Sequence, residues 1–570
     1  MERLEDTLRV AYRESFHQAL QDGSAKPFLF PYSMLGTMIL PALWLTIPHV
    51  SRPWIYQTRW AVLAFVVMFN VHVMRVCSST NFGLAYSGGL FAAWGIMQTL
   101  GMLVWKRPQF EAARVVKVVK GIKGIKKAMS EAEAETEIET ETETEADADV
   151  GAESVNGGQI LHKGATNGHN GSTGQQGLRL RNGVANGSLE KVARPESMSE
   201  EVEYRWQKFP AEAPFLDRLG WVLDLMTSLR GAGWSYSINS IPRPTIPPII
   251  HDNAKVDISS ISLRTTSGFT HAATERGFLF GHLSTCLLLS IFLDFMVSQM
   301  KRTDPYFLLG PDHTYDVPPF IANQSPQQLR FCRLSWVLVV IVAAIVNLFT
   351  IYNVCHYYTC KMIFPSRAFL WSYPSAFGGF CEVLDRGLAG WWGSWWHQTF
   401  RLQFLAPSTY LLERGYLRKG SVVANLFGLF VTFLQSGLLH AAGSLSTIPR
   451  TKPLNQLWFF LLQALGIVVQ QYLAAGLRRW GPGLPRLVKY GGNIAFSIGW
   501  LYFTAPMFVD DVAASGLWLY EPVPVSVLRL LGLGRVLGDG NATEAWWRWD
   551  KEYWLKIYEP KHWWEAGIAF

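Results

Sequence analysis

The chain has 570 residues, of which 49% are hydrophobic and only 17% are charged. An average soluble protein has about 25% charged residues, and here the apolar residues come in long blocks rather than in alternation or as a helical stripe. This composition excludes an ordinary soluble domain and predicts an all-α, polytopic integral membrane protein. The net charge of +7 says little as a total, because the charges are unevenly placed. We expect no nucleic-acid partner.

The N-terminal part predicts membrane helices without a signal peptide. The first 25 residues contain several acidic residues and no long apolar core, so the first apolar helix would act as the membrane signal. A helix needs about 20 apolar residues to cross a bilayer, which predicts about eight or nine spans. Eight lie near residues 28–48, 59–76, 83–105, 278–299, 333–354, 421–442, 456–477 and 489–509. A ninth apolar piece, 361–381, contains two prolines and would form a short or re-entrant helix.

A long polar insertion separates the third and fourth predicted spans. It begins with a basic piece, Lys106 to Lys127, which is either a helix on an anionic membrane surface or an ordinary juxtamembrane positive cluster. An acidic stretch, Glu131 to Asp149, and a stretch rich in Gly, Asn and Ser, Gly151 to Ser188, follow. Neither can bury enough apolar surface to fold, so both should be disordered. The basic cluster predicts a cytosolic location for the insertion.

From Tyr204 onward the sequence predicts ordered structure again. The run from Phe215 to Leu225 has helical apolar spacing, and Gly231 and Gly233 fit a helix end and a turn. The predicted parts are N-terminal membrane helices (1–105), the cytosolic insertion (106–203), a membrane-surface helix and loop (204–275), a catalytic membrane core (276–510) and an aromatic C-terminal tail (511–570).

Two histidines occur in strongly apolar surroundings. His397 follows the run WWGSWW, and His440 ends the apolar run FGLFVTFLQSGLL. An imidazole in hydrocarbon loses its hydration and is by default a candidate functional group, because its neutral form can take a proton from a hydroxyl group. Structural alternatives exist for each residue. His440 could hydrogen-bond a neighbouring helix, and His397 could face lipid headgroups in an aromatic belt.

The other polar residues of the apolar segments are expected to make hydrogen bonds between helices more often than to line a substrate tunnel. They are His72, His282, Asp294, Asn347, Asn353 and His356. Cys355, His356 and Cys360 offer too few ligands for a zinc site. We therefore expect no bound metal and no bound cofactor.

The two histidine segments together resemble a known family. The order Trp-Trp-Gly-x-x-Trp-His-Gln (391–398), followed by an apolar helix that ends Leu-Leu-His (438–440), resembles the wax synthase-like branch of the membrane-bound O-acyltransferase superfamily. More narrowly, it is similar to fungal members that acetylate terpenoid and meroterpenoid alcohols. The loop RGAGW (230–234) looks like that group as well. The resemblance covers roughly residues 204–510 and the apolar N-terminus. One departure is Ser394-Trp395, where many members carry a basic residue.

The resemblance implies a reaction and roles for particular residues. His440 matches the catalytic histidine, and His397 matches a second polar position where relatives carry Asn or His. The implied reaction is acyl transfer from a coenzyme A thioester, acetyl-CoA in the fungal group, to a lipophilic alcohol. His440 would act as the base, while His397 or Gln398 would orient the acyl group or stabilise the oxyanion. The expected substrate-binding residues are Trp392, Trp396, Gln398 and Arg401.

In this interpretation acyl-CoA is a co-substrate, and the enzyme is a multi-pass protein of the endoplasmic reticulum membrane. Two alternatives remain open. A wax or sterol ester synthase would use a long-chain acyl-CoA, and pocket length would distinguish it. A transporter would be expected to show an internal repeat of the hydropathy pattern, which this sequence lacks. The acceptor alcohol, the regiochemistry and the oligomeric state do not follow from the sequence.

Overall fold

The computed structural model describes residues 2–119, 202–316, 319–480, 484–537, 546–558 and 566–569. Residues 118–203 form a unit separate from the rest of the chain. The acidic and Gly/Asn/Ser-rich stretches that the sequence predicts to be disordered lie outside the described residues. The description below therefore concerns the larger unit, 1–117 and 204–570.

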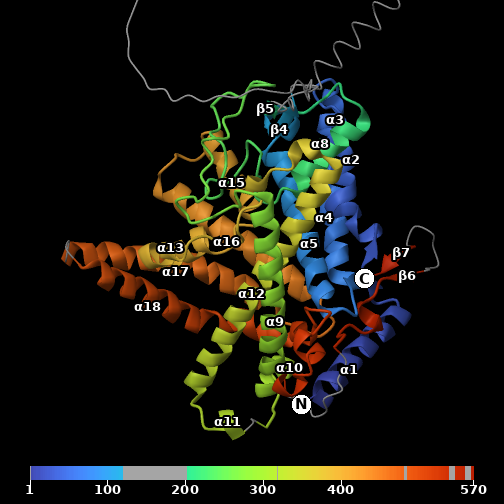
Figure 1. The fold of residues 1–570 in the computed structure, drawn as a ribbon, viewed down its shortest axis with the longest axis vertical. Helices are drawn as coiled ribbons and strands as arrows, with labels where there is room; N and C mark the ends of the chain where they lie inside the picture. The colour runs from blue at the N-terminus through green and yellow to red at the C-terminus, as the bar shows by residue number, and fades with distance from the viewer. Residues whose placement is uncertain are drawn as a thin grey trace, which may run out of the picture. The chain divides into compact units, whose positions relative to one another are not determined.

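Helices make up most of the described structure (Figure 1). The first half of the chain contains α1 (Glu2–Gln21), α2 (Leu40–Thr46), α3 (Pro53–Gln57), α4 (Arg59–Val76), α5 (Phe82–Leu100), α6 (Pro108–Glu111) and α8 (Phe215–Thr227). The second half contains α9 (Glu275–Thr303), α10 (Tyr306–Leu309), α11 (Pro319–Ala322), α12 (Pro326–Ile363), α13 (Cys381–Arg386), α14 (Leu388–Gly390), α15 (Arg401–Glu413), α16 (Val422–Leu445), α17 (Pro453–Trp480), α18 (Arg486–Thr504), α19 (Pro506–Ala514), α20 (Val527–Leu530) and α21 (Gly534–Leu537).

Strands are few and short within the described residues. They are β1 (Lys26–Pro27), β2 (Leu29–Phe30), β3 (Cys77–Ser78), β4 (Arg114–Val119), β5 (Val202–Gln207), β6 (Lys556–Tyr558) and β7 (Gly567–Ala569). β1 pairs in parallel with β3. β7 pairs antiparallel with both β2 and β6, so the two ends of the chain share one small sheet. The predominance of helices confirms the predicted all-α fold class.

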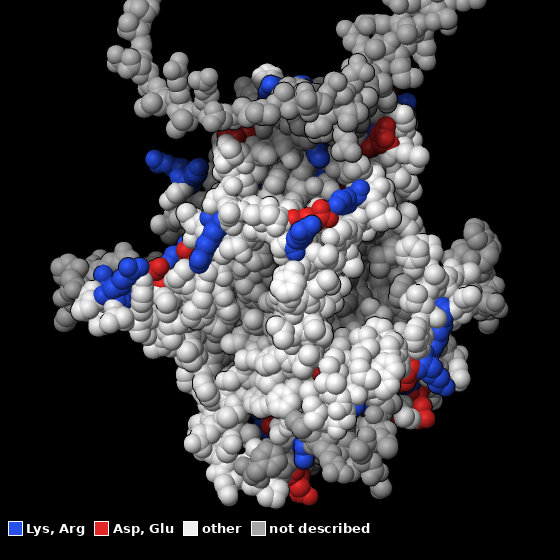
Figure 2. All heavy atoms as spheres, in the orientation of Figure 1, with Lys and Arg blue, Asp and Glu red and all other residues white. Residues whose placement is uncertain are grey.

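Six described helices are long and apolar enough to cross a bilayer. They cover Pro53–Val76, Phe82–Trp105, Glu275–Thr303, Pro326–Ile363, Val422–Leu445 and Pro453–Leu477, and each coincides with one of the predicted spans, which extends beyond the helix by one residue at most. The protein is therefore a multi-pass membrane protein. On the face drawn in Figure 2, a broad uncharged surface extends over α9 and α12, as expected for helices that face lipid.

The other two predicted spans have different structures. The segment 28–48 contains only a shorter apolar helix, Tyr32–Thr46, which includes a π-helical turn, η2 (Leu35–Ile39). The segment 489–509 is divided between α18 and α19, which meet at Ala505 and Pro506. Proline has no N–H to donate to the helix ladder, so it favours an interruption at this point.

Two local predictions are corrected by the structure. The apolar piece 361–381 does not form a helix of its own, because α12 continues to Ile363 and only two short 3-10 turns follow, at Pro365–Arg367 and Leu370–Ser372. The described part of the basic piece ends in strand β4 rather than in a helix. The Val115 N–H donates to the Gly233 carbonyl (2.8 Å), and the valine-rich run favours extended backbone. Residues 120–127 lie outside the described residues.

The longest helix, α12, begins at a well-defined cap. Ser325 and Gln328 form a capping box, in which each side chain accepts the backbone N–H of the other, and Pro326 occupies the first turn. With 38 residues, α12 is about 57 Å long, more than a bilayer core requires. It can therefore contribute to cavities at several depths.

Helix α16 packs against α17 on one side and against α5 on another. Glycine residues, which have no side chain, allow this close approach. A Cβ atom at Gly437 would lie 2.8–3.0 Å from Leu457 of α17, and one at Gly89 of α5 would lie 2.1 Å from the Ala442 carbonyl oxygen. Both distances are too short for a side chain, so these glycines bring the two helices against the C-terminal half of α16.

Outside the bundle core, α1 is held by buried charges. Lys301 of α9 donates to Glu5 (2.6 Å) and to Glu521 (3.2 Å), and Arg9 also pairs with Glu5 (2.6 Å) and Glu521 (3.3 Å). Because buried charges are tolerated only when they are paired, this cluster ties the N-terminal helix to α9 and to the segment after α19.

Candidate active site

His440 lies near the end of α16, a helix whose start is fixed by Ser421, which accepts the Ala424 N–H (3.1 Å). The His440 ring stacks on Phe460 of α17, with centroids 4.9 Å apart and an interplanar angle of 12°. Phe508 of α19 meets it edge-on at 5.6 Å. The imidazole is thus clamped between aromatic rings of two other helices, which defines its orientation.

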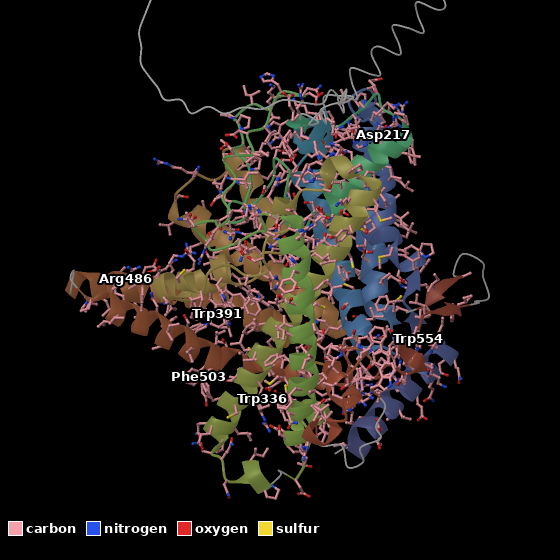
Figure 3. All side chains as sticks on the ribbon, in the orientation of Figure 1. Asp217, Trp336, Trp391, Arg486, Phe503 and Trp554 are labelled. Carbon is pink, nitrogen blue, oxygen red and sulfur yellow. The ribbon has the colours of Figure 1, made fainter. Side chains whose placement is uncertain are left out.

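His397 follows a tight π-helical turn, η6 (Trp391–Trp395). The Trp396 N–H donates to the Trp391 carbonyl oxygen (2.7 Å), the five-residue spacing that defines a π-helix. Trp391 is buried, and in the view of Figure 3 it lies between Arg486 of α18 and Trp336 of α12. The predicted tryptophan-rich segment is therefore folded into the protein interior at Trp391.

Two polar side chains stabilise this turn through hydrogen bonds. The Gln398 amide donates to the carbonyl oxygens of Trp392 (3.1 Å) and Trp396 (2.6 Å). Arg401 donates to the Gln398 side-chain oxygen (2.7 Å) and to the Gly393 carbonyl oxygen. Because both amide hydrogens of Gln398 are used in this way, Gln398 has no donor left for a substrate.

His397 and His440 line the same cavity, which has a volume of about 260 Å³. The wall is mostly apolar and comes from α12, η6, α16, α17, α18 and α19. Its residues are Phe331, Leu334, Ser335, Val337, Leu338, Ile341, Ile345, Trp391, Trp392, Trp396, His397, His440, Phe459, Phe460, Ile498, Leu501, Tyr502, Ala505, Phe508 and Val509. An apolar chamber with two imidazoles suits a lipophilic substrate that must exchange a proton.

The polar atoms that line the cavity differ in whether they already have a hydrogen-bond partner. His397 Nδ1 lies 2.9 Å from Thr399 Oγ1, and His440 Nδ1 lies 3.3 Å from the Tyr86 hydroxyl. In each ring this leaves Nε2 without a hydrogen bond to any described residue. The Trp392 indole N–H is buried and also has no partner among the described residues. An unpaired buried donor is costly, so a substrate atom that accepts this N–H would gain affinity.

The structure brings four of the six predicted site residues to the cavity wall, namely His440, His397, Trp392 and Trp396. Gln398 and Arg401 do not line this cavity, since their polar atoms are committed to the backbone of the turn. Their predicted role in substrate binding stays a prediction. In the structure they hold the two tryptophans in place.

The sequence did not single out three residues that the structure connects to His440: Tyr86 of α5, Gln456 of α17 and Asp511 of α19. One signal was present in the sequence, because a Gln and an Asp in apolar helices require hydrogen-bond partners. Nothing in the sequence indicated that those partners would be one another.

The RGAGW loop (230–234) does not line the histidine cavity. Arg230 donates to the carbonyl oxygens of Ser375 (2.8 Å) and Pro374 (2.8 Å), and it lines a small polar cavity together with Asp224 and Arg367. Gly231 and Gly233 have positive φ angles, 67° and 76°, which confirms the predicted turn. Arg230 is absent from the wall of the histidine cavity, so the loop supports the fold beside that cavity.

Asp224 of α8 is the acceptor at the centre of this polar region. It pairs with Arg367 (2.8 Å) and with Arg114 (3.1 Å). Burial alone would raise the pKa of Asp224, but the two guanidinium groups outweigh burial and hold the pKa below its usual value. The carboxylate therefore stays ionised at neutral pH. Among the described residues, no group of three or more His, Cys, Asp or Glu could hold a metal ion.

The fold and the cavity belong to a multi-pass helical membrane protein with a histidine-bearing apolar chamber. Residues 373–462, which include both histidines, match the model of the membrane bound O-acyl transferase family. This match confirms the predicted resemblance to that superfamily and supports the prediction of an acyltransferase. No solved structure matches the chain with significance.

Three relatives can be compared directly. The acetyltransferase spyB of Aspergillus fumigatus is 31% identical over 93 residues, 16% of each chain. The acetyltransferase aurG of Calcarisporium arbuscula is 33% identical over 109 residues, 19% of this chain and 26% of the relative. The O-mevalon transferase yanI of Aspergillus niger is 22% identical over 276 residues, 45% of this chain and 54% of the relative. In all three cases the match spans well under two thirds of the relative.

Proposed function

We propose that this protein transfers an acyl group from a coenzyme A thioester to the hydroxyl group of a lipophilic alcohol within the membrane. The observation that carries the proposal is that His397 and His440, from separate elements, open into one apolar cavity. The family match across residues 373–462 supports the same chemistry.

The proposed mechanism uses His440 as the general base. Its Nε2 takes the proton of the alcohol while the alcohol oxygen attacks the thioester carbonyl carbon. The C–S bond then breaks, and the thiolate leaves with the proton from the imidazolium, which restores neutral His440. The products are the ester and free coenzyme A. General base catalysis of this kind contributes about 10²–10⁴ in rate.

The negative charge on the carbonyl oxygen needs a donor, and two groups are available. His397 can donate from Nε2 if Thr399 Oγ1 donates to its Nδ1 (2.9 Å). The unpaired Trp392 N–H is the second candidate. Gln398 is not proposed for this role because its amide is already bonded to the turn. Preorganised donors of this type stabilise an oxyanion best in a site that excludes water.

We propose a short acyl group, acetyl in the first instance, as the group transferred. The volume of the histidine cavity, about 260 Å³, lies just below the usual range of ligand-binding pockets, roughly 300–1,000 Å³. A long acyl chain together with a fatty alcohol would need more room. Two relatives are named acetyltransferases, which favours an acetyl donor. The resemblance of the 391–398 and 438–440 segments to fungal family members leads us to propose a terpenoid or meroterpenoid alcohol of fungal secondary metabolism as the acceptor. A polytopic enzyme with such substrates would reside in the endoplasmic reticulum membrane.

A second candidate donor carries a larger acyl group. The relative whose match extends furthest along this chain, among the three compared, is named for O-mevalonyl transfer. The cavity wall between α12 and α18 includes exposed residues such as Phe331 and Ile498. A longer acyl group could extend past them toward the lipid.

The test is an assay of microsomes that contain the protein. Labelled acetyl-CoA, mevalonyl-CoA and palmitoyl-CoA are each offered with a panel of terpenoid alcohols and with hexadecanol. We expect ester from acetyl-CoA and a terpenoid alcohol, and at least a hundredfold loss in His440→Ala. The matched control His251→Ala, at an exposed loop position, should keep full activity. Ester formed only from palmitoyl-CoA and hexadecanol would reject the acetyl donor, and full activity in His440→Ala would reject the mechanism.

A further inference from the structure

A chain of four polar side chains from four helices runs from the cavity into the bundle. His440 Nδ1 of α16 lies 3.3 Å from the Tyr86 hydroxyl of α5. The Tyr86 hydroxyl lies 2.7 Å from the Gln456 side-chain oxygen of α17. The Gln456 amide nitrogen lies 2.7 Å from Oδ2 of Asp511 on α19.

The direction of every hydrogen bond in this chain follows from its far end. The Gln456 amide nitrogen donates to Asp511 Oδ2, which fixes the orientation of the Gln456 amide. Asp511 Oδ1 is engaged as well, because it accepts the Lys452 backbone N–H (2.6 Å). The Gln456 oxygen must then face Tyr86. The single hydroxyl proton of Tyr86 goes to that oxygen, which leaves a Tyr86 lone pair toward His440.

We infer that Tyr86, Gln456 and Asp511 are positioning residues that fix the tautomer of His440, so that Nδ1 carries the proton and Nε2 presents its lone pair to the substrate hydroxyl. The inference rests on the proposed function, because it concerns the base of that reaction. When His440 accepts the substrate proton, the Nδ1–H bond to Tyr86 becomes a bond from a cation and strengthens. The same chain therefore also stabilises the imidazolium in the transition state.

Burial makes the chain rigid. Gln456 and Asp511 have relative exposures of 0% and 2%, and Tyr86 has 8%. Water therefore has little access to substitute for a missing partner. Phe460 stacks on the His440 ring and Phe508 meets it edge-on, and Tyr86 is the one hydrogen-bond partner of this ring among the described residues.

The first test is Tyr86→Phe, which keeps the ring and removes only the hydroxyl. We expect kcat to fall about 10- to 100-fold, the range for losing a hydrogen bond to a charged group, with KM for both substrates unchanged. The control Tyr553→Phe removes another buried hydroxyl, which accepts the Glu521 N–H (3.1 Å) away from the cavity. That variant should keep the wild-type kcat. A purely structural role for Tyr86 would lower the amount of folded enzyme and leave kcat per molecule intact.

The second test separates tautomer control from general packing. In Gln456→Met, the Tyr86 hydroxyl loses its acceptor and can turn to donate to His440 Nδ1, which forces the wrong tautomer. We therefore expect Gln456→Met to lower kcat at least as much as Tyr86→Phe. The double variant Tyr86→Phe/Gln456→Met should be no slower than Gln456→Met alone, whereas independent packing defects would multiply.

The outcomes also distinguish this inference from the proposed function. If wild-type protein forms no ester from any donor and alcohol, the proposed function fails. If wild-type protein is active and His440→Ala is inactive, but Tyr86→Phe retains the wild-type kcat, the positioning role is overturned while the proposed function stands. Multiplicative losses in the double variant would also overturn it.

Discussion

The Tyr86 ring lies directly against Gly443, one turn after His440 on α16. A Cβ atom at position 443 would come within 2.9 Å of the Tyr86 ring and 3.0 Å of the Tyr86 carbonyl oxygen. Real side chains do not pack at these distances without displacement. The absence of a side chain at Gly443 therefore sets the position of the tyrosine that contacts His440 Nδ1.

Gly443→Ala should disturb both stability and activity. We expect a loss of about 1–3 kcal/mol in unfolding free energy from overpacking, together with a lower kcat because Tyr86 moves away from His440. The matched control on the same helix is Gly428→Ala, whose Cβ would meet Ser408 at 3.6 Å, an ordinary contact. Thermal unfolding in detergent and ester formation per folded molecule measure both effects. Equal behaviour of the two alanine variants would contradict the prediction.

The activity should depend on the hydrogen-bond donor that His397 provides rather than on the size of its side chain. His397→Ala removes a proposed oxyanion donor, for which a decrease of about 10²–10³ in kcat is typical. His397→Asn should retain more activity, because an amide N–H can replace the imidazole donor. The measurement is kcat at saturating acyl-CoA for both variants. Asparagine and alanine variants of equal activity would remove His397 from the oxyanion role.

Arg401 should act through the geometry of the tryptophan turn. Arg401→Met removes the hydrogen bonds to Gly393 and Gln398, and each bond to a charged group contributes about 1.5–3 kcal/mol. Trp392 and Trp396 would then lose their fixed orientation, so we expect a lower melting temperature and a raised KM. Arg418→Met, at an exposed position of the following loop, is the control. An unchanged KM in Arg401→Met would argue against the bracing role.

The α12 wall of the cavity should influence the length of the acyl group. Leu338 lines the cavity, and Leu338→Ala would enlarge it. A methylene group in an apolar pocket discriminates by about 1–3 kcal/mol, or 10–200-fold. The ratio of kcat/KM for butyryl-CoA over acetyl-CoA should therefore rise about tenfold or more. Leu348→Ala changes an exposed leucine of the same helix and should leave this ratio unchanged.

Asp224 should be a major source of stability outside the spanning helices. Asp224→Asn leaves Arg367 and Arg114 without their shared partner, and breaking a buried pair costs about 3–5 kcal/mol. Asp217→Asn, at an exposed position on the same helix (Figure 3), should have little effect. Thermal unfolding at pH 7 compares the two.

The pH dependence of this contribution has a definite sign. The folded-state pKa of Asp224 is lowered, so its ionic contribution is fully present above the ordinary pKa of about 3.9 and is lost as pH falls through the folded-state value. The stability difference between wild-type protein and Asp224→Asn should therefore shrink below about pH 4. A difference that stays constant from pH 7 down to pH 3 would contradict this assignment.

Most of the membrane architecture could be predicted because bilayer thickness imposes a length on apolar runs. Each of the six long apolar helices coincides with a predicted span. The exceptions have local causes. Pro506 interrupts the run at 489–509, and the prolines after Ile363 end α12 before the piece at 361–381 can form a helix. The cytosolic placement of the insertion stays a prediction.

The candidate site could be predicted in part. His397 and His440 stood out because imidazoles in apolar runs are costly, and Trp392 and Trp396 accompany them on the cavity wall. Gln398 and Arg401 have the composition of ligand-binding residues, but the turn they flank has unpaired carbonyl groups that they satisfy first. A sequence shows which groups need partners and not where those partners are.

The sequence by itself determined a helical membrane protein and two imidazoles in an apolar setting, because both follow from local composition and the energetics of burial. Only the tertiary structure decided that these imidazoles share one cavity. It also decided that Tyr86, 354 positions before His440, lies at Nδ1 and is itself held by Gln456 and Asp511. Such contacts depend on how glycine-lined helices approach one another, and packing between distant segments has no signature in a local pattern.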